Sequence, residues 1–106
     1  MRRAGTRTVV VAAEDVEWFE AASYYARLHV GSDTFLVRES MNALEARLDP
    51  ARFIRTHRSA IVQLRRITAL ERKRLGDHAA LLKSGTRAPV GRNRWAAVSK
   101  AVADRQ

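Results

Sequence analysis

Short stretches in which apolar and polar residues alternate recur along the chain, which is the pattern of strands that bury one face. Many of these stretches also carry β-branched or aromatic side chains, which favour strands. They predict strands at residues 8–13, 16–21, 24–30, 34–38, 53–57, 67–72, 79–83 and 87–90. Turn-forming residues lie between them, at 23–24, 31–33, 76–77 and 84–85. Residues 24–38 therefore predict a β-hairpin.

Apolar residues recur at helical spacing in a segment near the middle of the chain. Met41, Leu44 and Leu48 lie on one face of a helix. Ser40 is a suitable N-cap, and Pro50 ends the helix shortly after Leu48. The sequence therefore predicts a short helix between Ser40 and Pro50.

A second helix is predicted at the end of the chain, where Trp95, Val98 and Val102 share a face and Asn93 is a candidate cap. Residues 59–63 fit either a turn or a short helical piece. Together these elements predict a mainly β fold of short strands and tight turns with two short α-helices.

No repeat, low-complexity segment or linker interrupts the 106 residues, so we expect a single domain over residues 1–106. We expect frayed ends at residues 1–5 and 104–106. The chain has no cysteine, which excludes disulfides, thiolate zinc sites and a cysteine nucleophile and fits a reducing compartment. No apolar run suggests a membrane span or a secretory signal, so a cytoplasmic location is predicted.

Positive charge is the most informative feature of the composition. The chain has 20 basic and 11 acidic residues, a net charge of +9, and all but three of the basic residues are arginine. Residues 1–49 hold 6 basic and 8 acidic side chains (6 − 8 = −2), whereas residues 50–106 hold 14 and 3 (14 − 3 = +11). This asymmetry indicates a surface in the second half that faces a polyanion. The alternative is an ordinary solvated face.

Catalytic, cofactor and metal sites find no support in the sequence. His29, His57 and His78 are far apart and belong to no metal-binding motif. His57 and Ser59 would share a face of a strand, but a Ser–His pair also needs an orienting acid and an oxyanion hole. We therefore expect neither an enzyme nor a bound cofactor.

Two basic clusters are candidate binding sites for a polyanion. The first contains Arg52, Arg55, His57, Arg58, Arg65 and Arg66, and the second contains Arg87, Arg92 and Arg94. Arginine pairs with phosphates and with guanine edges, and Asn93 in the second cluster is able to read adenine. Structural roles are the alternatives: Arg55 paired with Glu17 or Glu20, His57 as a hydrogen-bonded packing residue, and Asn93 as a cap alone.

The same segments resemble a known family. FIRTHRSAIVQLRRI (residues 53–67) resembles the F-x-R-x-H-R-S-x-I-V-N-x-x-x-I motif of LytTR-type DNA-binding domains. WFEAASYYARLHV (18–30), RESMNALEARLDPARF (38–53) and GDHAALLKSGTRAPVGRNRW (76–95) are similar to other segments of that family, in the same order. The likeness covers almost the whole chain, with a core at about residues 8–103.

The resemblance implies an elongated β–β–β arrangement of small antiparallel sheets and a bacterial transcription regulator. Such domains usually follow a receiver domain in response regulators of two-component systems, or another sensor module. They place loops into successive major grooves of double-stranded DNA. Their sites are paired direct repeats, so a second copy of the domain on DNA is a further expected partner.

Three regions carry the DNA contacts that the resemblance implies. The first is the loop after the second strand, with Ser23, Tyr24, Ala26 and Arg27. The second is the His-Arg-Ser motif, with His57, Arg58, Ser59 and the nearby Arg55. The third is Arg92, Asn93 and Arg94, in which we expect Arg92 to read a base and Asn93, like Arg58, to make phosphate or mixed contacts.

Three positions depart from the family pattern. Gln63 replaces an asparagine, which is expected to change a local backbone hydrogen bond. Gly91 replaces a serine and is expected to loosen the loop before Arg92. Ala26 provides no side-chain donor. We expect these changes to alter the DNA sequence that is read, not the fold.

Sequence-specific binding of duplex DNA is the leading functional prediction. One alternative is an interaction module whose basic face meets an acidic regulatory protein. Another is non-specific or RNA binding, although Tyr24 and Tyr25 are the only candidates for the aromatic platform that single strands need. Steep loss of binding with salt indicates counterion release from a duplex. Only competition with unrelated DNA separates specific from non-specific contact.

Overall fold

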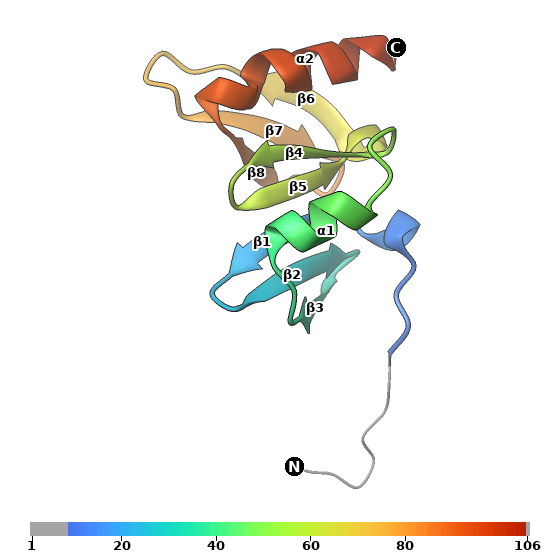
Figure 1. Cartoon of the computed structure of the whole chain (residues 1–106). Helices are drawn as coiled ribbons and strands as arrows, with labels where there is room; N and C mark the ends of the chain where they lie inside the picture. Colours follow the sequence, from blue (N-terminus) through green and yellow to red (C-terminus); the bar gives the residue numbers. More distant parts are fainter. Residues whose placement is uncertain (1–8, 106) are drawn as a thin grey trace, which may run out of the picture.

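The strands of the chain form two small antiparallel sheets, and a computed structural model describes residues 9–105 (Figure 1). The first sheet has the order β3-β2-β1-β5-β4 and the second the order β6-β7-β8. The strands are β1 (Trp18–Ala22), β2 (Tyr25–Val30), β3 (Asp33–Val37), β4 (Phe53–His57), β5 (Ala60–Gln63), β6 (Ile67–Glu71), β7 (His78–Leu82) and β8 (Arg87–Val90). The helices are α1 (Met41–Arg47) and α2 (Trp95–Asp104), with 3₁₀ turns η1 (Ala13–Asp15), η2 (Leu64–Arg66) and η3 (Arg92–Arg94).

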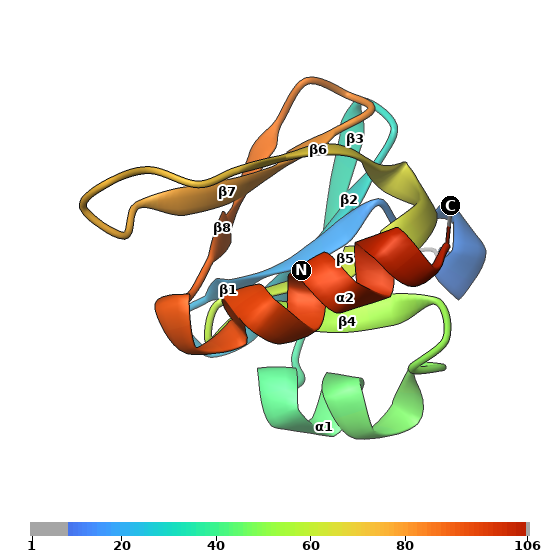
Figure 2. The same cartoon turned by 90° about the horizontal axis from the view of Figure 1, so that it is seen from above.

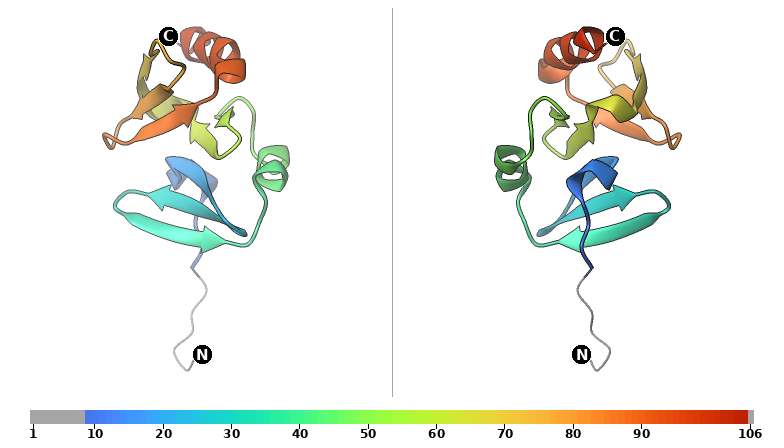
Figure 3. Two further views of the ribbon diagram at one scale, coloured as in Figure 1. Left: turned by 90° about the vertical axis from the view of Figure 1, so that its left-hand side faces the viewer. Right: turned by 90° about the vertical axis from the view of Figure 1, so that its right-hand side faces the viewer.

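The molecule is elongated, with principal extents of 51 × 26 × 26 Å. Figures 1 and 2 show α1 beside the first sheet and α2 across the other end, over β4 and the second sheet. The two side views in Figure 3 separate the β2–β3 hairpin from the β6–β8 sheet, with β1, β4 and β5 between them. The expected fold class, mainly β with small antiparallel sheets and two short helices, is confirmed.

Two hydrophobic clusters fill the space on either side of β1 and β5. Because neighbouring residues of a strand face opposite sides, Phe19 and Ile61 pack into the cluster under α1, whereas Trp18 and Val62 pack against the second sheet and α2. The first cluster comprises Val16, Phe19, Ala26, Leu28, Met41, Leu44, Phe53 and Ile61. The second comprises Trp18, Ala60, Val62, Ala80, Leu82, Ala88, Val90 and Val98. β1 and β5 are therefore the layer shared by both cores.

The helix α1 begins and ends as the sequence predicted. Ser40 accepts a hydrogen bond from the backbone N–H of Ala43, 3.0 Å away, which caps the first turn. Met41 and Leu44 are buried on the face that packs against the first sheet. The hairpin of β2 and β3 is confirmed as well, with Val30 paired with Asp33 at its turn.

Three predictions about local structure were wrong. Residues 9–12 form no strand and lead into η1, and Thr8 lies outside the described residues. Residues 59–63 contain the strand β5, not a turn or helical piece. Asn93 is not the cap of α2 but lies inside η3, and no side chain caps either of these elements.

The predicted frayed ends fall only partly within the described chain. Residues 1–5 and Gln106 lie outside it. Asp104 is the last residue of α2, where it pairs with Lys100 at 2.9 Å. Among residues 9–105, neither helix has the length and apolar character needed to cross a membrane.

Candidate nucleic-acid interface

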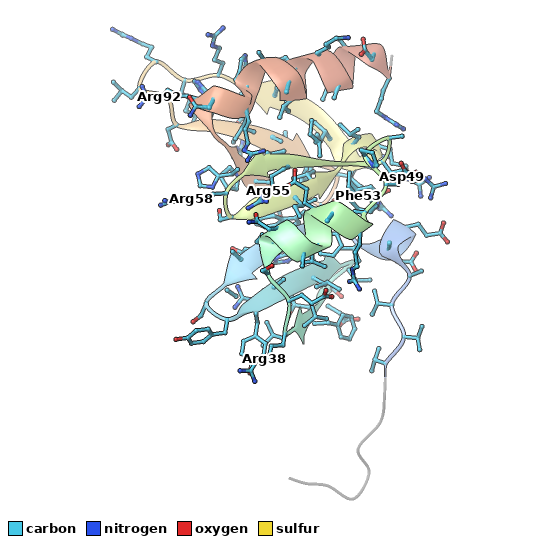
Figure 4. The ribbon with its side chains drawn as sticks, viewed as in Figure 1. Arg38, Asp49, Phe53, Arg55, Arg58 and Arg92 are labelled. Atoms are coloured by element: carbon cyan, nitrogen blue, oxygen red, sulfur yellow. The ribbon has the colours of Figure 1, made fainter. Side chains whose placement is uncertain are left out.

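Loops from three parts of the chain meet along one edge of the molecule. They are the β1–β2 turn, the β4–β5 turn and the segment from Gly91 into η3, all on the left-hand side of Figure 1. Figure 4 shows Arg58 and Arg92 on this side, with Asp49 on the far side. All three sequence regions expected to contact DNA are thus brought to the same edge.

Backbone hydrogen bonds connect these three loops to one another. The N–H of Ala21, at the end of β1, donates to the carbonyl of Ser59 in the β4–β5 turn at 2.9 Å. The N–H of Gly91 donates to the carbonyl of Thr56 at 2.7 Å, and the Thr56 hydroxyl donates to the carbonyl of Pro89 at 2.8 Å. Because Thr56 is fully buried, the core sets the spacing between the β4–β5 turn and the segment from Gly91 into η3.

The β1–β2 turn presents a hydroxyl and an aromatic ring to solvent. Ala22 pairs with Tyr25, so Ser23 and Tyr24 form the two-residue turn. Ser23 has a φ of 60°, and Tyr24 is 82% exposed. Arg27 is half-exposed and donates to Glu20 at 3.2 Å. Ala26, which the resemblance placed beside them, is fully buried and has no access to a ligand.

Arg55 is buried, although the sequence places it among the expected contact residues. Its side chain is 8% exposed and forms an ion pair with Glu45 of α1 at 2.7 Å. Its Nε and Nη2 donate to the carbonyls of His57 and Arg58 at 2.9 and 2.8 Å. The sequence suggested Glu17 or Glu20 as the acid that pairs with Arg55, but the structure places Glu45 there. Arg55 therefore fixes the backbone of the turn from which Arg58 projects (Figure 4).

His57 is hydrogen-bonded to Ser59, two residues further along the chain. Its Nδ1 accepts a hydrogen bond from the backbone N–H of Ser59 at 3.1 Å and lies 2.8 Å from the Ser59 hydroxyl. Burial, together with the positive charges of Arg58, Arg94 and Arg55, lowers the pKa of His57 from its ordinary value of 6.5. Since Nδ1 is an acceptor, the neutral ring carries its proton on Nε2. His57 is thus a neutral hydrogen-bonded residue that shapes the turn.

The segment that carries Arg92 is firmly placed. Gly91 has a φ of −71°, and its N–H donates to the carbonyl of Thr56. Arg92 and Asn93 are exposed, and Arg94 is half-buried, with Nη1 3.5 Å from the carbonyl of Arg55. Arg92 therefore projects from an anchored segment. Arg94 faces the end of β4, next to the β4–β5 turn.

Gln63, the other departure from the motif, has a structural role. It is buried, and its amide donates to the carbonyls of Glu14 and Val16 at 3.0 and 2.7 Å. The expected change in a backbone hydrogen bond therefore falls on the segment before β1, far from the three loops.

Sequence reasoning missed Arg38, which lies beside the β1–β2 turn. Arg38 follows β3, and it lines a shallow surface pocket together with Ser23 and Tyr24. In the sequence it is an isolated cation that precedes a helix, so no local signal marked it. Only the pairing of β2 with β3 brings it to this place.

Charge on this edge is largely uncompensated. Among residues 9–105, no carboxylate lies within ion-pair distance of Arg38, Arg58 or Arg92. In the same range no three acidic or histidine side chains gather as they would around a metal ion. The edge offers exposed guanidinium groups, an amide and hydroxyls, which suit phosphates and base edges.

Comparisons with known proteins find similar sequences and a similar fold. The family model of the LytTr DNA-binding domain matches residues 6–103. The chain is 33% identical over 89 residues to the CO-responsive transcriptional regulator RcoM of Rhodospirillum rubrum, covering 83% of this chain and 38% of that protein. It is 31% identical over 93 residues to the heme-containing CO-sensing transcriptional regulator RcoM 1 of Paraburkholderia xenovorans, covering 85% and 34%. The chain thus spans little more than a third of these relatives.

A solved structure has the same fold. It is the LytTr DNA-binding domain of a putative methyl-accepting/DNA response regulator from Bacillus cereus, with a TM-score of 0.78 and 25% sequence identity. The match covers 87% of this chain and 84% of that one.

Proposed function

The chain belongs to the LytTr DNA-binding domain family, and from this premise we propose that it reads a specific sequence of double-stranded DNA through loops placed in successive major grooves. DNA binding by a transcription regulator is the activity of this family, and neither the family nor the fold is that of an enzyme class. The specific site, the grooves and the residue roles are the proposal.

The observation that carries the proposal is the single edge on which the three loops meet. Backbone hydrogen bonds from Ala21 to Ser59 and from Gly91 to Thr56 hold the loops at fixed separations. Sequence readout needs side chains at fixed positions along a duplex, because base edges repeat at regular intervals along the groove. A preformed edge supplies such positions without ordering flexible segments on binding.

The exposure of each side chain suggests its role. Arg92 is the proposed base reader, because its guanidinium is exposed and is able to bind guanine in a bidentate manner. Arg58 and Asn93 are proposed to contact phosphates or to make mixed contacts. Ser23 and Tyr24 extend the interface to the β1–β2 turn, and Arg38 joins them there.

The remaining predicted residues are proposed to position the contact residues or to contact DNA only conditionally. Arg55, His57 and Ser59 are proposed to fix the conformation of the β4–β5 turn. Arg94 is proposed to hold the end of β4 against η3. Arg27 is proposed to contact a phosphate only if it leaves Glu20, to which it is hydrogen-bonded here.

The wider context belongs to the same proposal. We expect two copies to bind paired direct repeats, each through one edge. We expect the domain to work in the cytoplasm as the output part of a bacterial regulator, with a receiver or sensor module as its input. Both relatives described above are transcriptional regulators, which supports this context.

The test is selection of bound duplexes from a random pool near physiological salt, followed by sequencing. Enrichment of two direct repeats about one helical turn or more apart is the expected result. Salt-sensitive binding without enrichment would contradict specific readout and leave a non-specific binder. No binding to any duplex would point to an acidic protein as the partner of the basic edge.

A further inference from the structure

A second group of cations lies beside Arg92, in the loop between β6 and β7. Arg72, Lys73 and Arg74 are consecutive and exposed. They line one open cleft with Gly76, His78 and Arg92. This loop projects from the same side of the molecule as the three loops of the candidate interface (Figure 1). None of the predicted contact regions includes it.

The loop has a defined conformation that directs these side chains. The N–H of Gly76 donates to the carbonyl of Lys73 at 3.1 Å and closes a turn, in which Gly76 has a φ of 81°. The N–H of Lys73 donates to Nδ1 of His78 at 3.0 Å. The guanidinium carbon of Arg72 lies 5.7 Å from the ring of Trp95, at the start of α2. The loop is therefore attached to both β7 and α2.

Arg92 belongs to the same cleft as the loop. A Cβ atom at Gly76 would lie 2.7 Å from Cδ and 2.9 Å from Nε of Arg92. The Arg92 side chain thus packs against the backbone of Gly76, and a side chain at position 76 would push the end of Arg92 aside. The β6–β7 loop supports the residue that is proposed to read a base.

The charges in the cleft are not neutralised by the protein. Among the described residues 9–105, no carboxylate forms an ion pair with Arg72, Lys73, Arg74 or Arg92, and this includes the loop's own acid, Asp77. Four like charges in one cleft repel one another, and a polyanion removes this cost. The cleft opens beside the edge where the duplex is expected, so the backbone of the same duplex is the nearest polyanion.

We propose that Lys73 and Arg74, with Arg72 held on Trp95, form a phosphate-binding site that grips the duplex backbone alongside the groove entered by Arg92. This inference rests on the proposed function and deepens it. The site supplies affinity that does not depend on base sequence, whereas Arg92 supplies discrimination. It also lengthens the footprint of the domain beyond the three loops.

The test compares the double variant Lys73→Gln/Arg74→Gln with the wild type and with a matched control, Arg65→Gln/Arg105→Gln. Each double variant removes two positive charges. Arg65 lies in η2 and Arg105 directly follows α2, and both are exposed and line a pocket with Glu14 and Arg52. Although the sequence groups Arg65 with the first basic cluster, η2 and the C-terminal end of α2 lie on the side of the molecule opposite the three loops (Figure 1). Affinity is measured from about 50 to 300 mM salt on a selected duplex and on an unrelated one, because the salt slope counts phosphate contacts.

We expect Lys73→Gln/Arg74→Gln to reduce the slope of log affinity against log salt by about two and to weaken binding by on the order of tenfold or more. The loss should be equal on the two duplexes, so that their affinity ratio is preserved, and the control should keep the wild-type slope. A wild-type slope in Lys73→Gln/Arg74→Gln would overturn the phosphate site while leaving the proposed function intact. A wild type that binds no duplex would overturn the proposed function itself.

Discussion

At the scale of single residues, chemically identical side chains have different roles because their surroundings differ. Arg55 and Arg58 are three positions apart in the same motif. Arg55 is buried and donates to the carbonyl of Arg58, whereas Arg58 is exposed. The sequence identified both as basic but gave no means to separate them, because the acid that binds Arg55, Glu45, comes from α1.

This difference predicts opposite outcomes for two substitutions. Arg55→Ala should lower the free energy of unfolding by about 1–3 kcal/mol, because it leaves two turn carbonyls without their donor. Arg58→Ala should leave stability within about 0.5 kcal/mol and weaken binding to specific and random DNA alike. Urea unfolding and a binding titration on both variants check this. Equal stability of the two variants would contradict the structural role of Arg55.

Arg92 is the residue on which discrimination should depend. Arg92→Ala is expected to cost about 1–3 kcal/mol on the selected site and to relax the preference at one base position. The measurement is a set of binding titrations on the selected duplex and on its single-base variants. An equal loss on specific and random duplexes would instead make Arg92 a phosphate contact.

The pKa of His57 predicts how stability depends on pH. Burial and the cations around it lower this pKa in the folded state below the ordinary value of 6.5. Between the two values the unfolded chain binds the extra proton, so stability is complete above about pH 6.5 and falls as the pH drops toward the folded pKa. Urea unfolding from pH 7.5 to pH 5 should show this loss, and His57→Gln should reduce it. An unchanged pH profile in His57→Gln would assign the loss to other groups.

At the scale of elements, β5 shows why a buried strand is easily misread from sequence. All four of its residues are buried, because one face packs under α1 and the other against the second sheet. A strand buried on both faces lacks the alternation that marks a half-exposed strand. The opposite error occurs at residues 9–12. This β-branched run favours a strand, but it has no neighbouring strand to pair with, and Val10 remains 91% exposed.

β5 should therefore be far more sensitive to truncation than the segment before β1. Ile61 is 1% exposed and packs with Phe19 and Phe53. Ile61→Ala is expected to cost about 2–5 kcal/mol, through lost burial and the cavity that remains. Val10→Ala, the matched control, should change stability by less than about 0.5 kcal/mol. Similar losses in the two variants would contradict this account of the core.

Elements with a self-contained signal were predictable from the sequence. The hairpin of β2 and β3 has alternation and a turn, and α1 has a cap, an apolar face and a terminating proline. The start of α2 was not predictable, because the 3₁₀ turn η3 places Asn93 before the helix without capping it. The loops of the candidate site were identified by motif, whereas their common edge depends on pairing between distant strands.

At the scale of the whole molecule, polar contacts tie the two sheets into one unit. Glu17, next to β1 and largely buried, accepts from the hydroxyl and the backbone N–H of Ser84 at 2.5 and 3.1 Å. Ser84 lies in the turn between β7 and β8 of the other sheet. Because β1 also ends at the candidate interface, this contact links the second sheet to the position of the β1–β2 turn.

Loss of the Glu17 carboxylate should therefore weaken the junction of the sheets. Glu17→Ala is expected to lower the free energy of unfolding by about 1–3 kcal/mol, because it leaves the Ser84 N–H without its acceptor. Glu17→Gln, which keeps one acceptor oxygen, should cost less. The control is Asp104→Asn at the exposed pair with Lys100, where about 0.5 kcal/mol or less is expected. Thermal and urea unfolding check the order, and a Glu17→Ala variant as stable as the wild type would contradict it.

The anchoring of Gly91 has a consequence for how such a domain diverges. Its backbone is fixed by Thr56, its φ is accessible to every amino acid, and an added Cβ would meet its nearest neighbours, His57 and Thr56, no closer than 3.8 Å. A new side chain here would stand next to Arg92 without disturbing the scaffold. If Arg92 reads a base as proposed, a single substitution at position 91 is expected to change the preferred DNA sequence and to leave the frame that spaces the loops unchanged.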